Sequence, residues 1–164
     1  MLELAVYLKS KGHDVWAGCR KDSPVFEKCK NSGIKTAEFN FPEKGTGRLR
    51  KNIAHITDFI KENKIDIVHS NTNYDRTAGA AAAHLAGISH VASVHSLQSI
   101  SHNLTHWARN KFLVDMFAAD GNIVKNFLVN EDKIDVEKIK VINLGIDPES
   151  MERDERLRKK TRNE

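Results

Sequence analysis

Cysteine is scarce in this chain, and long apolar runs are absent. Two cysteines, Cys19 and Cys29, are too few for a disulfide framework, and no second pair suggests a zinc knuckle. No apolar stretch approaches the roughly 20 residues of a membrane-spanning helix. Met1 leads directly into an amphipathic segment without a signal-peptide pattern. We therefore expect a protein of a reducing, cytoplasmic compartment.

The glycine motifs that cradle phosphate groups are also missing. Neither GxGxxG nor GxxxxGK[ST] occurs anywhere, so the sequence gives no support to an autonomous nucleotide site, and we expect no cofactor. His102 and His106 have the i, i+4 spacing that can bind zinc, but no third ligand accompanies them. We therefore expect no metal site.

What remains is an ordinary globular composition. The 164 residues suffice for one domain with a real core, and 40% hydrophobic with 29% charged residues exclude a disordered chain. The net charge is +4, and basic residues crowd the last twelve positions. This terminal cluster lacks interleaved aromatic residues, so no nucleic-acid partner is expected.

The most informative stretch covers residues 65–96, IDIVHSNTNYDRTAGAAAAHLAGISHVASVHS. It indicates a strand ending at His69, a polar loop, a helix with small residues at Ala80–Ala83, and a strand ending at His95. Asp75 is expected to cap the helix. Such a right-handed βαβ unit makes its strands parallel neighbours, so both histidines are expected at the carboxyl edge, where open α/β sheets bind ligands.

The flanking sequence continues the alternation of helix and strand. Helices are expected at 2–11, 24–33, 49–63, 102–114 and 123–129, and strands at 14–19, 34–41, 116–119 and 139–144. Glycine separates helix from strand at Gly12, Gly33 and Gly87. The predicted class is α/β, with a doubly wound, mostly parallel Rossmann-like sheet. Because the chain opens on a helix, we expect this sheet to lack its first strand, which leaves unpaired edges at Val15 and Ile67.

Four segments resemble, in order, the motifs of one enzyme family. They are LKSKGHDV at 8–15, DIVHS at 66–70, VASVH at 91–95 and KIKVINLGIDP at 138–148. Together they resemble the amino-terminal half of glycosyltransferase family 4, whose enzymes have the two-domain GT-B fold. Asn143 and Leu144 depart from the family's usual proline and asparagine, and Gly121-Asn122 falls near a usual serine.

This resemblance implies a GT-B-like amino-terminal domain at residues 1–148, with 149–164 as a basic linker towards a second domain that is absent. The implied function is the acceptor side of a retaining glycosyltransferase. Such an enzyme moves a sugar from a nucleotide-diphosphate donor to a cell-envelope glycan, such as lipopolysaccharide, or to a lipid-linked acceptor. The missing domain carries the family's donor-nucleotide contacts, so the chain alone is expected to be inactive.

The resemblance also implies roles for particular side chains. His95 would be the catalytic residue, with its imidazole bonded to a hydroxyl of the donor sugar. The substrate-binding residues would be His69, Asn71, Asn73, Asp75, Arg20 and Ser96.

Simpler structural explanations exist for several of these residues. His95 could be a buried histidine satisfied by the backbone, and His69 could brace the loop instead of lining the cleft. Asp75 could serve only as a helix cap, and Arg20 could be a solvated loop residue.

Two kinds of macromolecular contact also follow from the sequence. A basic and aromatic face could meet anionic lipid at the inner face of the membrane, or could belong to ordinary amphipathic helices. Its residues would be Arg48, Arg50, Lys51, Trp107, Arg109, Lys111 and Phe112. Separately, exposed strand edges suggest an alternative function, a non-catalytic α/β module that associates with another chain or with itself.

Overall fold

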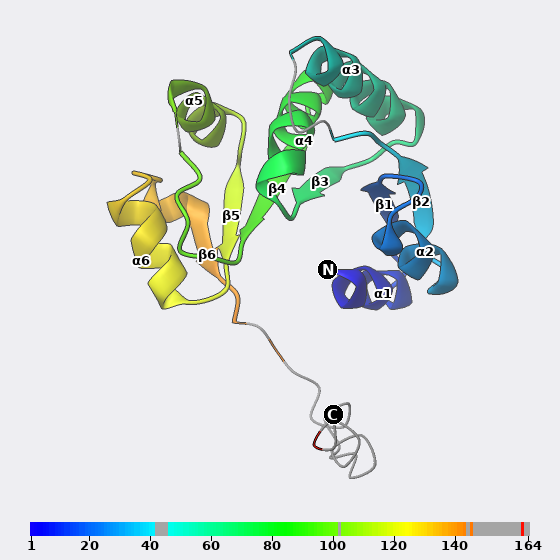
Figure 1. Cartoon of the computed structure of the whole chain (residues 1–164), viewed down its shortest axis with the longest axis horizontal. Helices are drawn as coiled ribbons and strands as arrows, with labels where there is room; N and C mark the ends of the chain where they lie inside the picture. Colours follow the sequence, from blue (N-terminus) through cyan, green and yellow to red (C-terminus); the bar gives the residue numbers. More distant parts are fainter. Residues whose placement is uncertain (42–45, 102, 144, 146–161, 163–164) are drawn as a thin grey trace.

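The computed structural model describes residues 1–41, 46–101, 103–143, 145 and 162, in which helices alternate with strands (Figure 1). The helices are α1 (Leu2–Ser10), α2 (Pro24–Asn31), α3 (Thr46–Glu62), α4 (Asn73–Ala86), α5 (Leu104–Phe112) and α6 (Asn122–Asn130), followed by a 3-10 turn, η1 (Val136–Lys138). The strands are β1 (Trp16–Cys19), β2 (Lys35–Glu38), β3 (Ile67–Ser70), β4 (Ser89–Val94), β5 (Met116–Ala119) and β6 (Ile139–Val141). The predicted order of elements is confirmed, and the differences lie at element ends.

Every strand pairing in the described chain is parallel, which confirms the α/β class. The strands form two sheets, with orders β1-β2 and β3-β4-β5-β6. Within the described residues, β1 therefore pairs only with β2, and β3 only with β4. Figure 1 shows the β1–β2 pair set apart from β3. In the part of the chain that the structure describes, β1 and β3 therefore each have one unpaired edge, as expected near Val15 and Ile67.

A layer made by α3 and α4 joins the two sheets into one body. Trp16 of β1 packs edge-on against Phe59 of α3, with ring centroids 5.1 Å apart. Phe39, just after β2, makes a similar contact with Phe59 at 5.3 Å. Val68 of β3 and Ala78 of α4 belong to the same apolar cluster. The two sheets consequently share one core although no hydrogen bond between β1 and β3 connects them.

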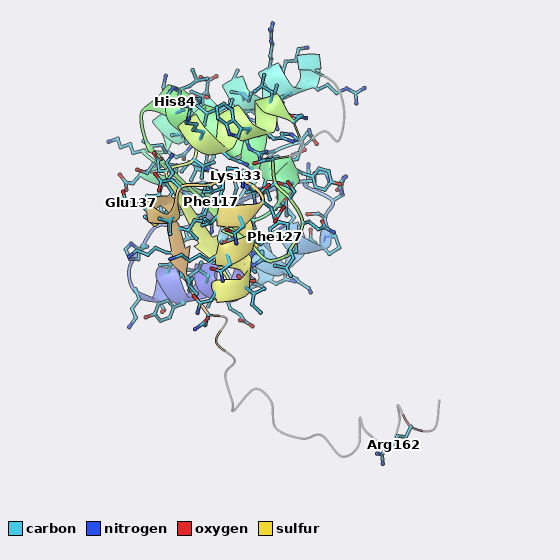
Figure 2. All side chains as sticks on the ribbon, turned by 90° about the vertical axis from the view of Figure 1, so that its left-hand side faces the viewer. His84, Phe117, Phe127, Lys133, Glu137 and Arg162 are labelled. Atoms are coloured by element: carbon cyan, nitrogen blue, oxygen red, sulfur yellow. The ribbon has the colours of Figure 1, made fainter. Side chains whose placement is uncertain are left out.

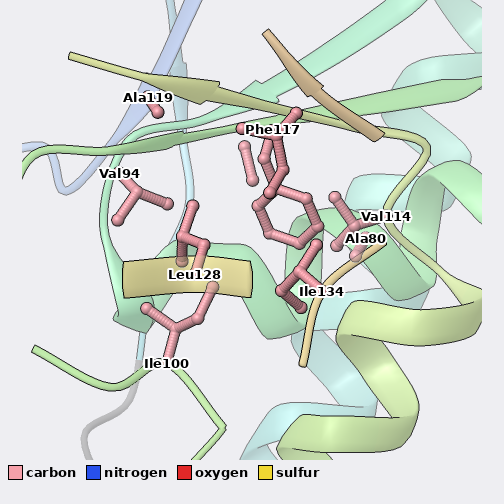
Figure 3. Packing of buried hydrophobic residues seen from close by; sticks show 10 residues of the cluster. Ala80, Val94, Ile100, Val114, Phe117, Ala119, Leu128 and Ile134 are labelled. Atoms are coloured by element: carbon pink, nitrogen blue, oxygen red, sulfur yellow. The ribbon is translucent and has the colours of Figure 1, made fainter. Parts of the chain in front are cut away.

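A second core lies on the four-stranded sheet. The ring of Phe117 on β5 is fully buried and points between Leu128 of α6, Val114 and Ile134 (Figure 3). Helix α6 lies over β5 and β6 when the molecule is viewed from its side (Figure 2). Ala80 of α4 also belongs to this cluster, so α4 contributes to both cores.

Helix α4 can serve both cores because its inner face carries almost no side-chain bulk. Ala78, Ala80, Ala82 and Ala83 are buried. At Gly79, an added Cβ would lie 2.8 Å from the Ser70 Oγ and 3.4 Å from a Val68 methyl carbon. Small residues therefore let the helix approach β3 closely, and this fixes the loop between β3 and α4.

The predicted glycine joints are confirmed. Gly12, Gly33 and Gly87 have φ values of +90°, +68° and +74°. These are left-handed conformations that glycine adopts without a Cβ penalty, so each helix turns directly into the next strand.

Some sequence-based expectations concern residues with no structural description. The last strand, expected at 139–144, ends at Val141, and residue 144 is outside the described part. The basic linker expected at 149–164 also falls outside it, apart from Arg162.

Both cysteines are free thiols, and burial raises their pKa values. None of the helices in the described ranges has the length and apolarity needed to cross a bilayer.

Candidate functional site

Three polar side chains meet where three neighbouring strands end. Asn71 follows β3, His95 follows β4 and Asp120 follows β5, each by one residue. These strands are adjacent and parallel, with Ser70 opposite Ala92 and Val94 opposite Ala119. Their carboxyl ends therefore lie at one edge, the position where ligands bind in open α/β sheets.

The His95 imidazole is bonded at both ring nitrogens. Nδ1 lies 2.8 Å and 2.7 Å from the two carboxylate oxygens of Asp120, and Nε2 lies 2.7 Å from Oδ1 of Asn71. Side-chain exposure is 41% for His95 and 20% for Asp120, so the ring stays open to a ligand while its carboxylate partner is more enclosed. An ionised carboxylate only accepts hydrogen bonds, so Nδ1 carries a proton.

His69 lies beside this group but inside β3, not beyond its end. Its Nε2 is 2.8 Å from the Ser93 hydroxyl of β4, and the side chain is half-buried. Burial lowers the pKa of His69, the Asp75 carboxylate opposes that shift, and His95 adds to it. The two histidines thus share one rim, as the sequence predicted, and His69 bonds across to the neighbouring strand.

The loop between β3 and α4 is held by a capping box. Thr72, not Asp75, is the N-cap of α4, and its hydroxyl accepts from the backbone of Tyr74 and Asp75. The expectation that Asp75 caps the helix is corrected in this detail, because Asp75 occupies the third helical position. Its carboxylate accepts from the amides of Thr72 at 2.9 Å and Asn71 at 3.1 Å. Asp75 therefore fixes the backbone from which Asn71 reaches His95.

Asn73 is tied to a buried arginine that the sequence analysis did not single out. Its Oδ1 accepts from Nη1 of Arg76 at 2.7 Å, while Nη2 of Arg76 donates to the Ser93 carbonyl at 2.9 Å. Arg76 is 2% exposed, and burial lowers its pKa. The guanidinium thus connects the start of α4 to the last residues of β4, just before His95.

A second buried cation supports the loop that follows His95. Arg109 of α5 donates to the Thr77 hydroxyl at 2.9 Å and to the Ile100 carbonyl at 3.0 Å. Burial, followed by repulsion from Arg76, lowers the pKa of Arg109 to about 10. Asp132 accepts from the amides of Ile100 and Ser101, and its negative charge opposes the lowering of the pKa of both guanidinium groups. The placement of Arg109 on an exposed basic face was wrong, because only 4% of it is exposed.

The other predicted site residues lie on the surface. Ser96 follows His95 and is exposed. Arg20 is exposed directly after β1, in the two-stranded sheet, and its carbonyl accepts from the Ser23 hydroxyl. The geometry brings together His95, His69 and Asn71, whereas Arg20 belongs to the other sheet.

Asp120 is the residue that sequence reasoning missed at the site. Its signal was available, because it stands directly after a short apolar strand, as His95 does. However, an aspartate in a loop next to a glycine is common and does not by itself indicate a site, and only the order of the strands shows that Asp120 faces a histidine.

On α5, a smaller version of the predicted basic and aromatic face is present. Trp107 and Phe112 contact edge-to-face with centroids 6.0 Å apart. The Lys111 ammonium lies 4.8 Å and 5.5 Å from the two ring centroids. Phe112 is 63% exposed.

Among the residues with described positions, no group of three or more histidine, cysteine, aspartate or glutamate side chains is placed to hold a metal ion. His102, one of the two histidines considered for zinc, lies outside those positions.

Known structures resemble this chain closely in fold and distantly in sequence. A glycosyltransferase from Rickettsia africae superposes with a TM-score of 0.83 at 23% identity, over 99% of this chain and 44% of that one. Anabaena HepE in complex with UDP-glucose gives 0.76 at 18% identity, over 99% and 44%. MurG from Acinetobacter baumannii gives 0.65 at 16% identity, over 89% and 41%. The chain thus spans less than half the length of these proteins and has the GT-B glycosyltransferase fold of their matching part.

No curated protein sequence matches the chain. The sequence profile described as Glycosyltransferase Family 4 matches residues 1–150, which include every described helix and strand up to β6. The ordered motifs, the parallel α/β fold and this match lead to one conclusion: the chain belongs to glycosyltransferase family 4.

Proposed function

We propose that this chain is the acceptor-side domain of a retaining glycosyltransferase. The enzyme would transfer a hexose from a nucleotide-diphosphate donor to a cell-envelope glycan or a lipid-linked acceptor. Family membership supports sugar transfer, and the HepE complex contains UDP-glucose. A further structural neighbour, WaaB, is a lipopolysaccharide outer core galactosyltransferase, which supports the choice of acceptor class.

The observation that carries this proposal is the position of His95. Its ring is exposed at the carboxyl edge and is held from two sides by Asp120 and Asn71. A sugar hydroxyl can both donate and accept a hydrogen bond, so it matches an imidazole nitrogen at this edge. In the proposal, His95 orients the donor sugar, while Asn71 and Ser96 border the same space.

The reaction needs more than this edge provides. A glycosyl cation that separates from a pyrophosphate is stabilised by donors aimed at the phosphate groups. The sequence has no glycine-rich phosphate loop. We therefore propose that the chain binds sugar weakly and does not transfer it without the donor-binding domain of the family.

Amide NMR spectra of the isolated chain test the proposal. Titration with UDP-glucose is expected to shift signals of residues 69–75 and 94–96, and His95→Ala is expected to abolish those shifts. UDP alone and glucose alone separate the nucleotide from the sugar. Shifts confined to other surfaces, or none at high ligand concentration, would refute the assignment. Robust transfer of labelled glucose to an envelope lipid extract by the chain alone would refute the proposed inactivity.

We also propose a cytoplasmic location with peripheral contact to the inner membrane face. Trp107, Lys111 and Phe112 support it, because an exposed Phe112 ring and a partly exposed Trp107 ring beside a cation suit the interface of an anionic bilayer. Co-sedimentation with phosphatidylglycerol vesicles, but not with phosphatidylcholine vesicles, is expected. Phe112→Ala should weaken it, and equal sedimentation with both vesicles would contradict an electrostatic contribution.

A second candidate function is a non-catalytic module that associates with another chain. The unpaired edges of β1 and β3 favour it, as do exposed apolar residues on β3 and α1, among them Ile67 and Tyr7. Light scattering after size-exclusion chromatography decides between the two, since a stable monomer over a wide concentration range would count against association.

A further inference from the structure

We propose that Asp120 is a positioning residue that fixes the proton and the orientation of the His95 ring, so that Nε2 is presented to a sugar hydroxyl. This inference rests on the function proposed above. It adds a residue for which neither the motifs nor the family match provides a role.

The contact is geometrically specific. Both oxygens of Asp120 lie within 2.8 Å of His95 Nδ1, so the carboxylate straddles a single N–H group. A histidine that donates one ring N–H to a carboxylate has its tautomer and ring plane fixed, and the other nitrogen is then free for the ligand. The neutral ring consequently carries its hydrogen on Nδ1 and offers a lone pair at Nε2.

The two residues are mounted on rigid elements. Val94 pairs with Ala119, the residues that precede His95 and Asp120, and Ala119 also pairs with Val141 of β6. The Ala119 carbonyl accepts from the Ile142 amide at 2.9 Å. A carboxylate held between two sheet neighbours keeps its partner within the tolerance that a binding site requires.

The remaining nitrogen faces a replaceable partner. Nε2 meets the side-chain amide of Asn71, which follows β3 and whose backbone is held by Asp75. The atom of Asn71 in this contact is the amide oxygen Oδ1, which only accepts, so the contact as placed needs a proton on Nε2. On the neutral ring with its hydrogen on Nδ1, the Asn71 amide must turn, either to present its NH₂ group to Nε2 or to leave that lone pair free to accept from a hydroxyl. In this arrangement the Asn71 side chain occupies the place beside Nε2 where the ligand would bind, and a sugar hydroxyl would replace this side chain or bind next to it.

Stability alone does not explain the pair. The His95 side chain is 41% exposed, and ion pairs at exposed positions contribute little to the free energy of unfolding. Asp120→Ala is therefore expected to leave the unfolding midpoint nearly unchanged, while the protonation pattern of His95 changes.

Long-range proton–nitrogen NMR of the chain tests the role directly. In the wild type, Nδ1 of His95 is expected to stay protonated from acid to alkaline pH, because both the imidazolium and the fixed neutral tautomer keep that proton. In Asp120→Ala, Nδ1 is expected to lose it at alkaline pH. Asp14→Ala is the charge-matched control, since Asp14 pairs with Lys35 at the two-stranded sheet. An unchanged Nδ1 signal in Asp120→Ala would overturn the proposal.

Ligand titration separates this inference from the proposed function. Asp120→Ala is expected to weaken the UDP-glucose response of residues 94–96 by about 2- to 10-fold, the range of one ordinary hydrogen bond. Wild-type affinity in Asp120→Ala would overturn the role of Asp120 in binding. A wild type that does not respond to UDP-glucose would refute the proposed function, and the Nδ1 signal would still decide whether Asp120 positions the ring.

Discussion

His90 lies within β4 and His95 directly follows it, and their different burial gives them different chemistry. His90 points from β4 into the protein, is fully buried, and meets the Ser70 hydroxyl at 2.8 Å. His95 stands one residue past the end of that strand and is open to solvent. Burial, followed by repulsion from Arg76, lowers the pKa of His90 to about 4. The buried ring is therefore neutral and structural, and the exposed one is available to a ligand.

The stability of the protein is expected to fall in weak acid because of His90. Its pKa is about 4 in the folded protein, below the ordinary 6.5, so the unfolded chain binds the proton more readily. The neutral His90 ring contributes fully to the free energy of unfolding above pH 6.5, and this stabilisation of the folded protein is lost as the pH falls towards 4. It amounts to roughly 3 kcal/mol in the free energy of unfolding. Urea unfolding across this window tests it, and His90→Gln should flatten the slope. Equal slopes in both proteins would contradict the assignment.

Any side chain at Gly79 is expected to destabilise the protein. In Gly79→Ala, the new Cβ would meet the Ser70 Oγ at 2.8 Å and disturb its bond to His90, at a cost of about 1–3 kcal/mol. The matched control is Gly47→Ala in α3, where a Cβ meets nothing within 4 Å. That variant should be neutral or up to about 1 kcal/mol more stable, because alanine favours helix. The same stability change in both variants, measured by thermal unfolding, would refute the close-packing explanation.

At the scale of elements, a buried carboxylate helps to hold the segment after β4. Asp132, which follows α6 and is 2% exposed, accepts from the Ser99 hydroxyl and from the amides of Ile100 and Ser101. Helix α5 contributes Arg109 to the same segment. This joint positions the chain that leaves His95, so the site edge depends on contacts between elements distant in sequence.

Asp132→Asn is expected to destabilise the protein by about 2–4 kcal/mol. The amide removes the charge that offsets two buried guanidinium groups and places an N–H group among backbone donors. Asp135→Asn is the control, because Asp135 is exposed and its carboxylate accepts from the Glu137 amide at a short turn. Its effect should stay below about 1 kcal/mol. Amide hydrogen exchange at Ile100 and Ser101 should rise in the first variant only, and unchanged exchange there would count against the joint.

For the molecule as a whole, the decisive feature is a parallel fold divided into two sheets. Parallel sheets are normally covered on both faces and paired along their strands. Here α3 and α4 bridge the sheets on one side, while Ile67 of β3 is 59% exposed on the other. An apolar residue beside an unpaired strand edge favours association with another polypeptide.

Ile67→Lys is therefore expected to reduce self-association with little change in stability. A charge on an exposed strand opposes pairing, and surface substitutions generally change the free energy of unfolding by less than about 0.5 kcal/mol. Ile123→Lys on α6 is the matched control, because Ile123 is 72% exposed and α6 packs on β5 and β6, away from β3 (Figure 1). Sedimentation velocity over a range of concentrations measures the effect. Equal association in the two variants would exclude a role for the β3 edge.

The sequence by itself determined the order of elements, the α/β class, the glycine joints and the family. These follow from local signals, since apolar spacing, caps and glycine act over a few residues of chain. It also predicted that His69 and His95 would share one rim, because parallel neighbours end at the same edge.

The tertiary structure alone decided which polar residues meet at that rim. Asp120 lies 25 positions from His95 in the chain and reaches it only because β5 pairs with β4. Burial of Arg76 and Arg109 likewise depends on how α4 and α5 pack, because the residue type alone does not show whether an arginine lies on the surface or in the core. Such contacts arise from strand order and helix packing, which join residues that no local pattern connects.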